Sequence, residues 1–228
     1  MKYTLFTLLS FLFVAQLSAQ SNQNTVSSNQ DSDPEAKAIL EKMRNKYEGY
    51  SSMEVSFELE IKFPEEPAEV QQITFMKKGE AYRVEMPGRK LISDGTTLWM
   101  IQERNKEVQI NDVPEVADDP GILSPQSLFS LYERKDFAYF LIGQSTENGK
   151  AIQQIEFKPL TDDSDFSKMR LTVVKGSNEL VRVKAFGKDG ARFTVKAKKI
   201  TPNKSLASSM FTFNKSDYSD YYVEDLRY

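Results

Sequence analysis

The sequence of 228 residues contains no cysteine and no histidine. Disulfide bonds, thiolate nucleophiles, imidazole bases and zinc sites built on imidazole or sulfur are therefore excluded. A glycine-rich phosphate-binding loop and the G-x-S-x-G motif of serine hydrolases are also absent from the sequence. These absences remove most hydrolase chemistries, and we expect neither a bound metal nor a cofactor.

The chain also lacks an excess of positive charge, since 30 Lys and Arg residues stand against 33 Asp and Glu residues, for a net charge of -3. Proteins that bind nucleic acid usually show net basicity, so nucleic acid is not an expected partner. The chain is rich in apolar material instead: 39% of its residues are hydrophobic, including 15 Phe and 10 Tyr. This composition is sufficient for a globular protein with a packed core.

Residues 1–19 have the pattern of a signal peptide for export. A charged start at Lys2 is followed by a run from Leu5 to Leu17 that is apolar except for three polar residues, and cleavage is expected after Ala19. The alternative, a membrane anchor, would need about 20 apolar residues. Residues 20–33 are mostly Ser, Asn and Gln and are predicted to be a disordered linker, which leaves residues 34–228 as one folded domain.

Two helices are predicted in this domain. Asp33 can cap a helix that starts at Pro34, and apolar residues then recur at helical spacing, at Ile39, Leu40, Met43, Tyr47 and Tyr50. The second helix is predicted to start near Ser124-Pro125 and to include Leu128, Phe129, Leu131 and Tyr132. This second helix is either a movable filler of a cavity or a permanent part of the core.

The rest of the domain is predicted to be extended. From Met53 to Phe63 apolar and polar residues alternate, which is typical of a β-strand with one buried face. Shorter extended segments follow, separated by turn signals such as Asp94-Gly95 and Asp189-Gly190. They lie at residues 70–77, 81–86, 90–93, 97–102, 107–111, 137–142, 152–157, 169–175, 180–186, 192–200 and 210–214. The pattern predicts a mainly β (α+β) fold with about eleven strands in one antiparallel, barrel-like sheet.

Two charged clusters have ordinary structural explanations. The acidic run Asp162, Asp163 and Asp165 lacks the glycine and the final glutamate of a calcium-binding loop, so we interpret it as a solvated loop. A basic strand face is formed by Arg192, Lys196, Lys198 and Lys199. We favour a solvent-facing strand whose charges protect it from unwanted pairing.

One segment resembles a known family. The residues Asp94, Gly95, Thr97, Leu98 and Trp99 match the D-G-x-T-L-W segment of the LolA family, the periplasmic carriers of outer-membrane lipoproteins. Further agreement lies in the surrounding segments, at residues 50–53, 75–78 and 209–214. The resemblance extends from Asp33 to Asp225 in the family order.

The resemblance implies an open antiparallel half-barrel with helices covering an apolar cavity that receives lipoprotein acyl chains. It implies a periplasmic protein without catalytic residues. The implied partners are lipoproteins as cargo, an inner-membrane ABC-type release complex and an outer-membrane acceptor. We expect the carrier to be a monomer.

The residues expected to contact acyl chains combine aliphatic, Met and aromatic side chains, which suit a surface that repacks around variable apolar guests. Any single one of these strands could equally be an ordinary strand on a core. The set is Met53, Val55, Phe57, Leu59, Phe75, Tyr82, Val84, Met86, Leu98, Met100, Phe129 and Phe157.

The gate over the cavity is where the sequence departs from the family. Many members have Arg followed by Pro at the end of the second strand, and that Arg is implicated in gating a lid. Lys78 and Gly79 occupy these positions here, and Lys lacks the planar fork of Arg, so a gate built on it should be looser. Arg83 or Arg89 could act in its place.

Three other functions stay open at this stage. A similar half-barrel senses lipid or protein in some envelope stress regulators, although these normally carry a further domain that is not expected after Tyr228. The cargo could be another lipid or a glycolipid. An enzyme acting through carboxylates alone is the third alternative, but no distinctive acidic pair supports it.

Overall fold

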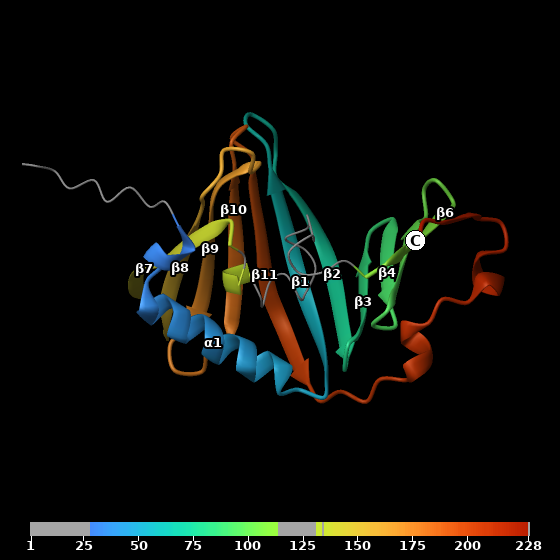
Figure 1. Ribbon diagram of the computed structural model, residues 1–228, viewed down its shortest axis with the longest axis horizontal. Coiled ribbons are helices and arrows are strands. Elements are labelled where there is room, and N and C mark those ends of the chain that lie inside the picture. Colours follow the sequence, from blue (N-terminus) through green and yellow to red (C-terminus); the bar gives the residue numbers. More distant parts are fainter. Residues whose placement is uncertain (1–27, 114–130, 134, 228) are drawn as a thin grey trace, which may run out of the picture.

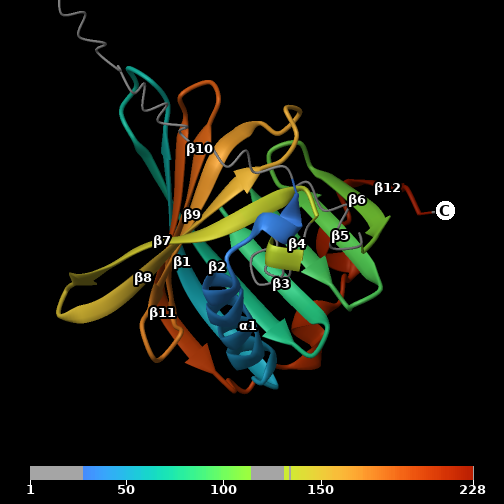
Figure 2. The same cartoon turned by 60° about the vertical axis from the view of Figure 1, so that its left-hand side comes forward.

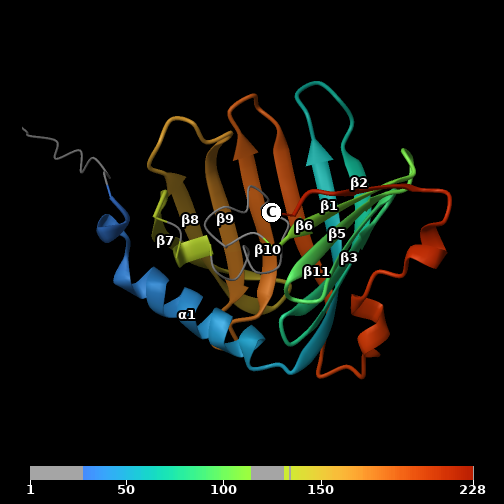
Figure 3. The ribbon, with the colours of Figure 1, turned by 45° about the vertical axis from the view of Figure 1, so that its right-hand side comes forward.

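The computed structural model describes residues 28–113, 131–133 and 135–227. Within these ranges twelve strands form one open sheet, in the order β12-β6-β5-β4-β3-β2-β1-β11-β10-β9-β8-β7, and one α-helix, α1, lies along the ends of several strands (Figure 1). The sheet curls so that β4, β5 and β6 face β8 and β9 across its hollow side without joining them (Figure 3). The predicted open half-barrel is confirmed.

The elements are η1 (Asn29–Asp31), α1 (Pro34–Glu48), β1 (Ser52–Lys62), β2 (Glu69–Lys78), β3 (Ala81–Met86), β4 (Arg89–Ser93), β5 (Thr97–Gln102), β6 (Glu107–Asp112), η2 (Leu131–Glu133), β7 (Phe137–Glu147), β8 (Lys150–Pro159), β9 (Phe166–Val174), β10 (Leu180–Gly187), β11 (Arg192–Pro202), η3 (Ser208–Phe211), η4 (Lys215–Tyr218) and β12 (Tyr222–Asp225). The η elements are short 3-10 helices.

Helix α1 starts as the sequence predicts and ends at Glu48, before Tyr50. The Asp33 carboxylate accepts a hydrogen bond from the backbone N–H of Glu35 at 2.8 Å, and Pro34 opens the helix. The buried face consists of Ala36, Ile39, Leu40, Met43 and Tyr47. This apolar stripe joins the helix to the main core cluster of the sheet.

The first residues described, 28–33, are the end of the predicted linker and contact strand β7. The side-chain amide of Asn29 donates to the carbonyl of Phe137 at 2.6 Å, and the N–H of Asp33 donates to the carbonyl of Tyr139 at 2.9 Å. Residues 28–33 therefore cover part of the outer edge of β7, where unpaired backbone groups need partners. Beyond them the β7–β8 hairpin projects from the body of the sheet (Figure 2).

Two strand predictions need correction. Residues 210–214, predicted as a strand, contain the end of the 3-10 helix η3, and the last strand is β12, which pairs with β6 in parallel. The sheet is therefore not antiparallel throughout. Residues 208–211 contact β3, which already pairs with β2 and β4, so they cannot join the sheet there. The free edge was that of β6, and β12 pairs with it instead.

The predicted second helix falls mostly on residues outside the described ranges, as does Phe129. Its described remainder, Leu131–Glu133, is the short 3-10 helix η2. Tyr132 in η2 is buried in the main core cluster and meets Tyr139 edge to face, with ring centroids 6.4 Å apart.

Candidate functional site

The inner face of the sheet, on the side of α1, is largely apolar. Directly opposed residues of neighbouring strands lie on the same face. One such row runs through Ile200, Val55, Phe75, Val84, Leu91 and Met100, from β11 to β5. A second row crosses the other half of the sheet through Tyr139, Phe157, Met169, Ala185 and Phe193.

The structure brings the predicted acyl-contact residues together on this inner face. Nine of them are buried members of one cluster: Met53, Val55, Phe57, Leu59, Phe75, Tyr82, Val84, Leu98 and Phe157. Met86 and Met100 are partly buried against the same cluster. The shared face is an observation, whereas contact with acyl chains stays a prediction.

Sequence reasoning missed most of the inner face between β8 and β11. Ile155, Leu171, Val183 and Val195 are all buried in the same cluster, and their strands bring them into one row. The signal was available, because apolar residues alternate along each of these strands. From strands β8 to β11 the predicted set contains only Phe157.

The basic residues predicted to gate the cavity lie on different faces. The Lys78 ammonium donates to the carbonyl of Leu206 at 2.9 Å and to the Ser208 hydroxyl at 3.1 Å, on the outer face of the sheet. Arg83 donates to the carbonyl of Met210 at 3.1 Å on that same face. Arg89 lies opposite Met86 and so belongs to a row of the inner face.

Lys77 is a further basic residue of the inner face that sequence reasoning did not single out. Its partners across the strands are Met53 and Tyr82, which are both buried on the inner face. Because neighbouring residues of a strand point to opposite faces, Lys77 and Lys78 cannot share one role.

The segment that carries the family resemblance supports the turn between β4 and β5. The Asp94 carboxylate accepts hydrogen bonds from the N–H groups of Thr96 and Thr97, at 2.9 and 2.8 Å, and from the Thr96 hydroxyl at 2.9 Å. Gly95 has a φ of 101°, and a Cβ there would come within 3.0 Å of the Cβ of Glu80. This turn therefore requires an acceptor side chain at Asp94 and a glycine at Gly95.

Beyond this turn the segment serves both faces of the sheet. Leu98 is buried on the inner face, whereas Trp99 stacks on Phe213 on the outer face, with ring centroids 6.1 Å apart. Tyr218 and Tyr221 continue this outer cluster. The segment after β11 thus covers the outer face of β4–β6.

Replacing Asp94 with Ala should lower the free energy of unfolding by about 1 to 3 kcal/mol, because it removes the charged acceptor of three hydrogen bonds. Desolvation raises the pKa of Asp94, but the bonds from Thr97 and Thr96 outweigh it, and the net pKa lies below the ordinary value. The stability that this carboxylate contributes is present above its unfolded-state pKa of about 3.9 and is lost as pH falls through the lower folded-state pKa.

Urea unfolding at neutral and at acidic pH measures this effect. The difference between wild type and Asp94→Ala should shrink at acidic pH, and Asp94→Asn, which keeps one oxygen acceptor, should lose less than Asp94→Ala. If Asp94→Ala and Asp94→Asn lose the same unfolding free energy, and if that loss is the same at neutral and acidic pH, the charged-acceptor role is contradicted.

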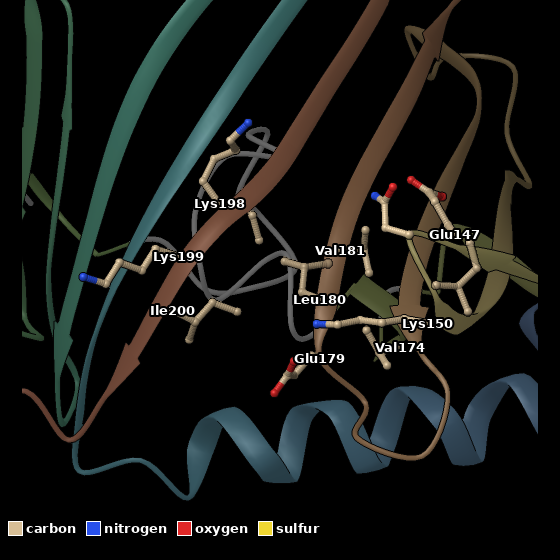
Figure 4. A pocket seen from close by; sticks show the side chains of 12 residues that line it. Glu147, Lys150, Val174, Glu179, Leu180, Val181, Lys198, Lys199 and Ile200 are labelled. Carbon is tan, nitrogen blue, oxygen red and sulfur yellow. The ribbon is translucent and has the colours of Figure 1, made fainter.

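Two hollows have linings that mix residues of the inner face with charged side chains. The first, of about 330 Å³, opens where β10 and β11 separate. Its lining combines Val174, Leu180, Val181 and Ile200 with charged residues such as Glu147 and Lys198 (Figure 4). The second, of about 610 Å³, lies between α1 and η2 and is lined by polar residues that include Arg44 and Glu133. Neither combines the size and apolar lining that several acyl chains would need.

The described residues offer no group of three or more Asp and Glu side chains that could hold a metal ion. In the same part of the chain, no helix has both the length and the apolar character to cross a membrane.

Comparison with known proteins identifies relatives of this fold. Residues 74–214 match the family model described as "Outer membrane lipoprotein carrier protein LolA". An uncharacterized conserved protein from Thermus thermophilus is 12% identical with a TM-score of 0.55, and the match covers 84% of this chain and 99% of that chain. The likeness to this structure shows a shared fold.

Other solved structures have lower TM-scores. A putative outer membrane lipoprotein-sorting protein domain from Vibrio parahaemolyticus is 13% identical, with a TM-score of 0.43 and coverage of 80% of this chain and 99% of that chain. The lipoprotein LppX from Mycobacterium tuberculosis is 13% identical, with a TM-score of 0.46 and coverage of 78% and 100%. No curated protein matches the chain.

Proposed function

The chain belongs to the family of the outer membrane lipoprotein carrier protein LolA, and from that membership we propose that it carries lipoproteins by holding their acyl chains against the inner face of the sheet. In this role it would move cargo across the periplasm from the inner to the outer membrane. Export through residues 1–19, loading by an inner-membrane ABC-type complex and delivery to an outer-membrane acceptor belong to the same proposal.

The observation that carries this proposal is the largely apolar inner face. Its rows of apolar residues cross strands from β7 to β5, and the described helix α1 lies along only one end of the sheet (Figure 1). Met53, Met86, Met100 and Met169 belong to it or pack against it. Unbranched, polarizable Met side chains suit guests whose chains differ in length.

A carrier must release its cargo, so the free energy gained by burying acyl chains must be partly cancelled by an opposing cost. Burying one methylene contributes about 0.8 kcal/mol, so one long acyl chain brings on the order of 10 kcal/mol before costs. A carrier that kept the whole of this burial free energy for each of several acyl chains could not release them. The inner face must therefore be partly covered by its own side chains when empty, and uncovering it must cost much of that gain.

Control of this uncovering by a basic residue is part of the proposal. Arg89 is the best supported of the three candidates, since its register agrees with the inner face. Lys78 and Arg83 hold residues 206–210 on the outer face, so their substitution should act on that attachment first.

Mass spectrometry of material co-purified from the native exported fraction tests the function. Acylated lipoprotein should be recovered with the wild-type protein. Recovery of other lipids without protein would replace lipoprotein by another cargo, and recovery of no lipid from freshly isolated protein would contradict the carrier proposal.

A further inference from the structure

The outer face of strands β9–β11 carries like charges in directly opposed positions. Arg170 lies opposite Lys184, Arg182 lies opposite Lys196, and Arg192 lies opposite Lys62 of β1. Like charges directly opposite each other destabilise a sheet. The whole chain has a net charge of -3, so this concentration of cations does not reflect its average composition.

One aromatic ring lies at the centre of these cations. The Phe186 ring centroid is 5.3 Å from Lys168 Nζ, 5.5 Å from Lys184 Nζ, and 5.4 and 5.0 Å from the guanidinium carbons of Arg170 and Arg192. Phe186 is half-buried. We call this surface the basic face: Lys168, Arg170, Arg182, Lys184, Arg192 and Lys196 around Phe186.

Carboxylates neutralise only part of the basic face. Glu156 pairs with Arg170 at 2.8 Å and Lys168 at 3.5 Å, but its side chain is only 9% exposed, whereas those of the two cations are 37% and 33% exposed. At this site the acid thus lies beneath the cations, so the side chains that meet solvent there are positive.

The other cations of the basic face differ in their partners. Arg182 pairs with Glu147 at 2.6 Å, and Lys196 pairs with Glu60 at 3.2 Å. Among the described residues, Lys184 and Arg192 have no carboxylate within ion-pair distance, and Arg192 donates to two backbone carbonyls of its own turn. These two side chains remain available for an external anion.

Protection of a sheet edge does not explain the basic face. Lysines guard exposed edge strands against pairing, which is the interpretation that the sequence favoured for Arg192 and Lys196. Strand β11 is an interior strand, however, because it pairs with β1 on one side and β10 on the other. The repulsion between opposed cations therefore needs another reason.

We propose that the basic face docks this protein onto the surface of an anionic lipid bilayer. The cations are distributed over three neighbouring strands of a broad sheet rather than gathered in a pocket, which matches an extended anionic surface. Lysine supplies three of the six cations and is depleted in interfaces between proteins, so an acidic protein partner is less well matched. Clusters of basic residues are attracted to anionic lipid, and each adds to the affinity.

This orientation leaves the cargo face free. The basic face and the inner face are opposite sides of the same strands, so docking by one turns the other away from the bilayer. The acidic β8–β9 loop with Asp162, Asp163 and Asp165 borders the basic face at one end. The negative charge of this loop would be repelled by an anionic bilayer, so we expect the outer face of the strands, rather than the loops, to contact the lipid.

Co-sedimentation with vesicles tests the proposal. Wild-type protein should bind vesicles that contain phosphatidylglycerol but not vesicles of phosphatidylcholine alone, and salt should weaken the binding by screening. The double variant Lys184→Gln/Arg192→Gln should bind roughly 30-fold more weakly, which corresponds to about 2 kcal/mol for two basic residues near an anionic surface. Because the change removes repulsion, its melting temperature should not fall.

The matched control is Lys42→Gln/Lys215→Gln, which makes the same change in net charge at exposed positions on α1 and η4. It should bind vesicles as wild type does. Equal losses for both double variants would overturn the proposal, since only net charge would matter. Wild-type binding without preference for phosphatidylglycerol would also overturn it and leave an acidic protein as the occupant to test.

Discussion

Phe57→Glu should abolish cargo binding while leaving a folded protein, with affinity for an acyl-chain probe falling by roughly 100-fold or more. Phe57 is 6% exposed and belongs to the main cluster of the inner face. An ionised carboxylate placed there without a partner costs several kcal/mol unless it becomes protonated. Each tenfold loss of affinity corresponds to about 1.4 kcal/mol, so even part of this cost gives the expected effect.

The neighbouring position supplies a matched control on the same strand. Ser56 lies on the outer face opposite Lys199, so Ser56→Glu adds the same charge where a cation can pair with it. This variant should bind the probe as wild type does. Fluorescence of an environment-sensitive apolar dye, together with circular dichroism, separates loss of binding from loss of fold. If Phe57→Glu unfolds the domain, Phe57 is ordinary core and the carrier proposal loses this support.

The inner face could be predicted from the sequence because alternation along a strand is a local signal. In β1, every second residue from Met53 to Leu59 is buried, and the polar residues between them point the other way. The same reasoning extends to Phe75, Tyr82 and Val84 once their strands are recognised. Pairing order was harder, since nothing local in the sequence says that β1 lies between β2 and β11.

The gate could not be predicted in the same way. Lys78 is assigned to the gate through its match to the family segment, whereas alternation from Phe75 puts Lys77 on the inner face and Lys78 on the outer face. The C-terminal segment posed a related problem, because Phe211 and Phe213 alternate with polar residues as in a strand. Phe211 instead packs with Met76 and Leu206, and Phe213 stacks on Trp99, so their apolar surface is buried without strand pairing.

Tyr47→Phe should lower the free energy of unfolding by about 1 to 3 kcal/mol through the loss of one hydroxyl. The Tyr47 hydroxyl accepts a hydrogen bond from the backbone N–H of Leu180 at 2.9 Å, where β10 begins beside the separation of β10 from β11. Removing the hydroxyl leaves that buried N–H without its acceptor and loosens α1 from the sheet. Tyr50→Phe is the control, since the half-buried Tyr50 meets the Tyr47 ring edge to face at 5.9 Å and should tolerate the change.

The same hydroxyl predicts how the stability of the protein depends on alkaline pH. Desolvation by burial raises the pKa of Tyr47 from its ordinary value of 10.0 to about 12. The unfolded chain releases this proton above pH 10 while the folded chain retains it, so the stability tied to Tyr47 is intact below the unfolded pKa and is lost as pH rises toward the folded pKa. Since one pKa unit corresponds to about 1.4 kcal/mol, the loss from this group should reach roughly 3 kcal/mol.

Other groups also titrate in this range, so the measurement is the difference in unfolding free energy between wild type and Tyr47→Phe at successive pH values. That difference should decrease steadily as pH approaches 12; a difference that stays constant with pH would show that Tyr47 ionises as easily in the folded chain as in the unfolded one.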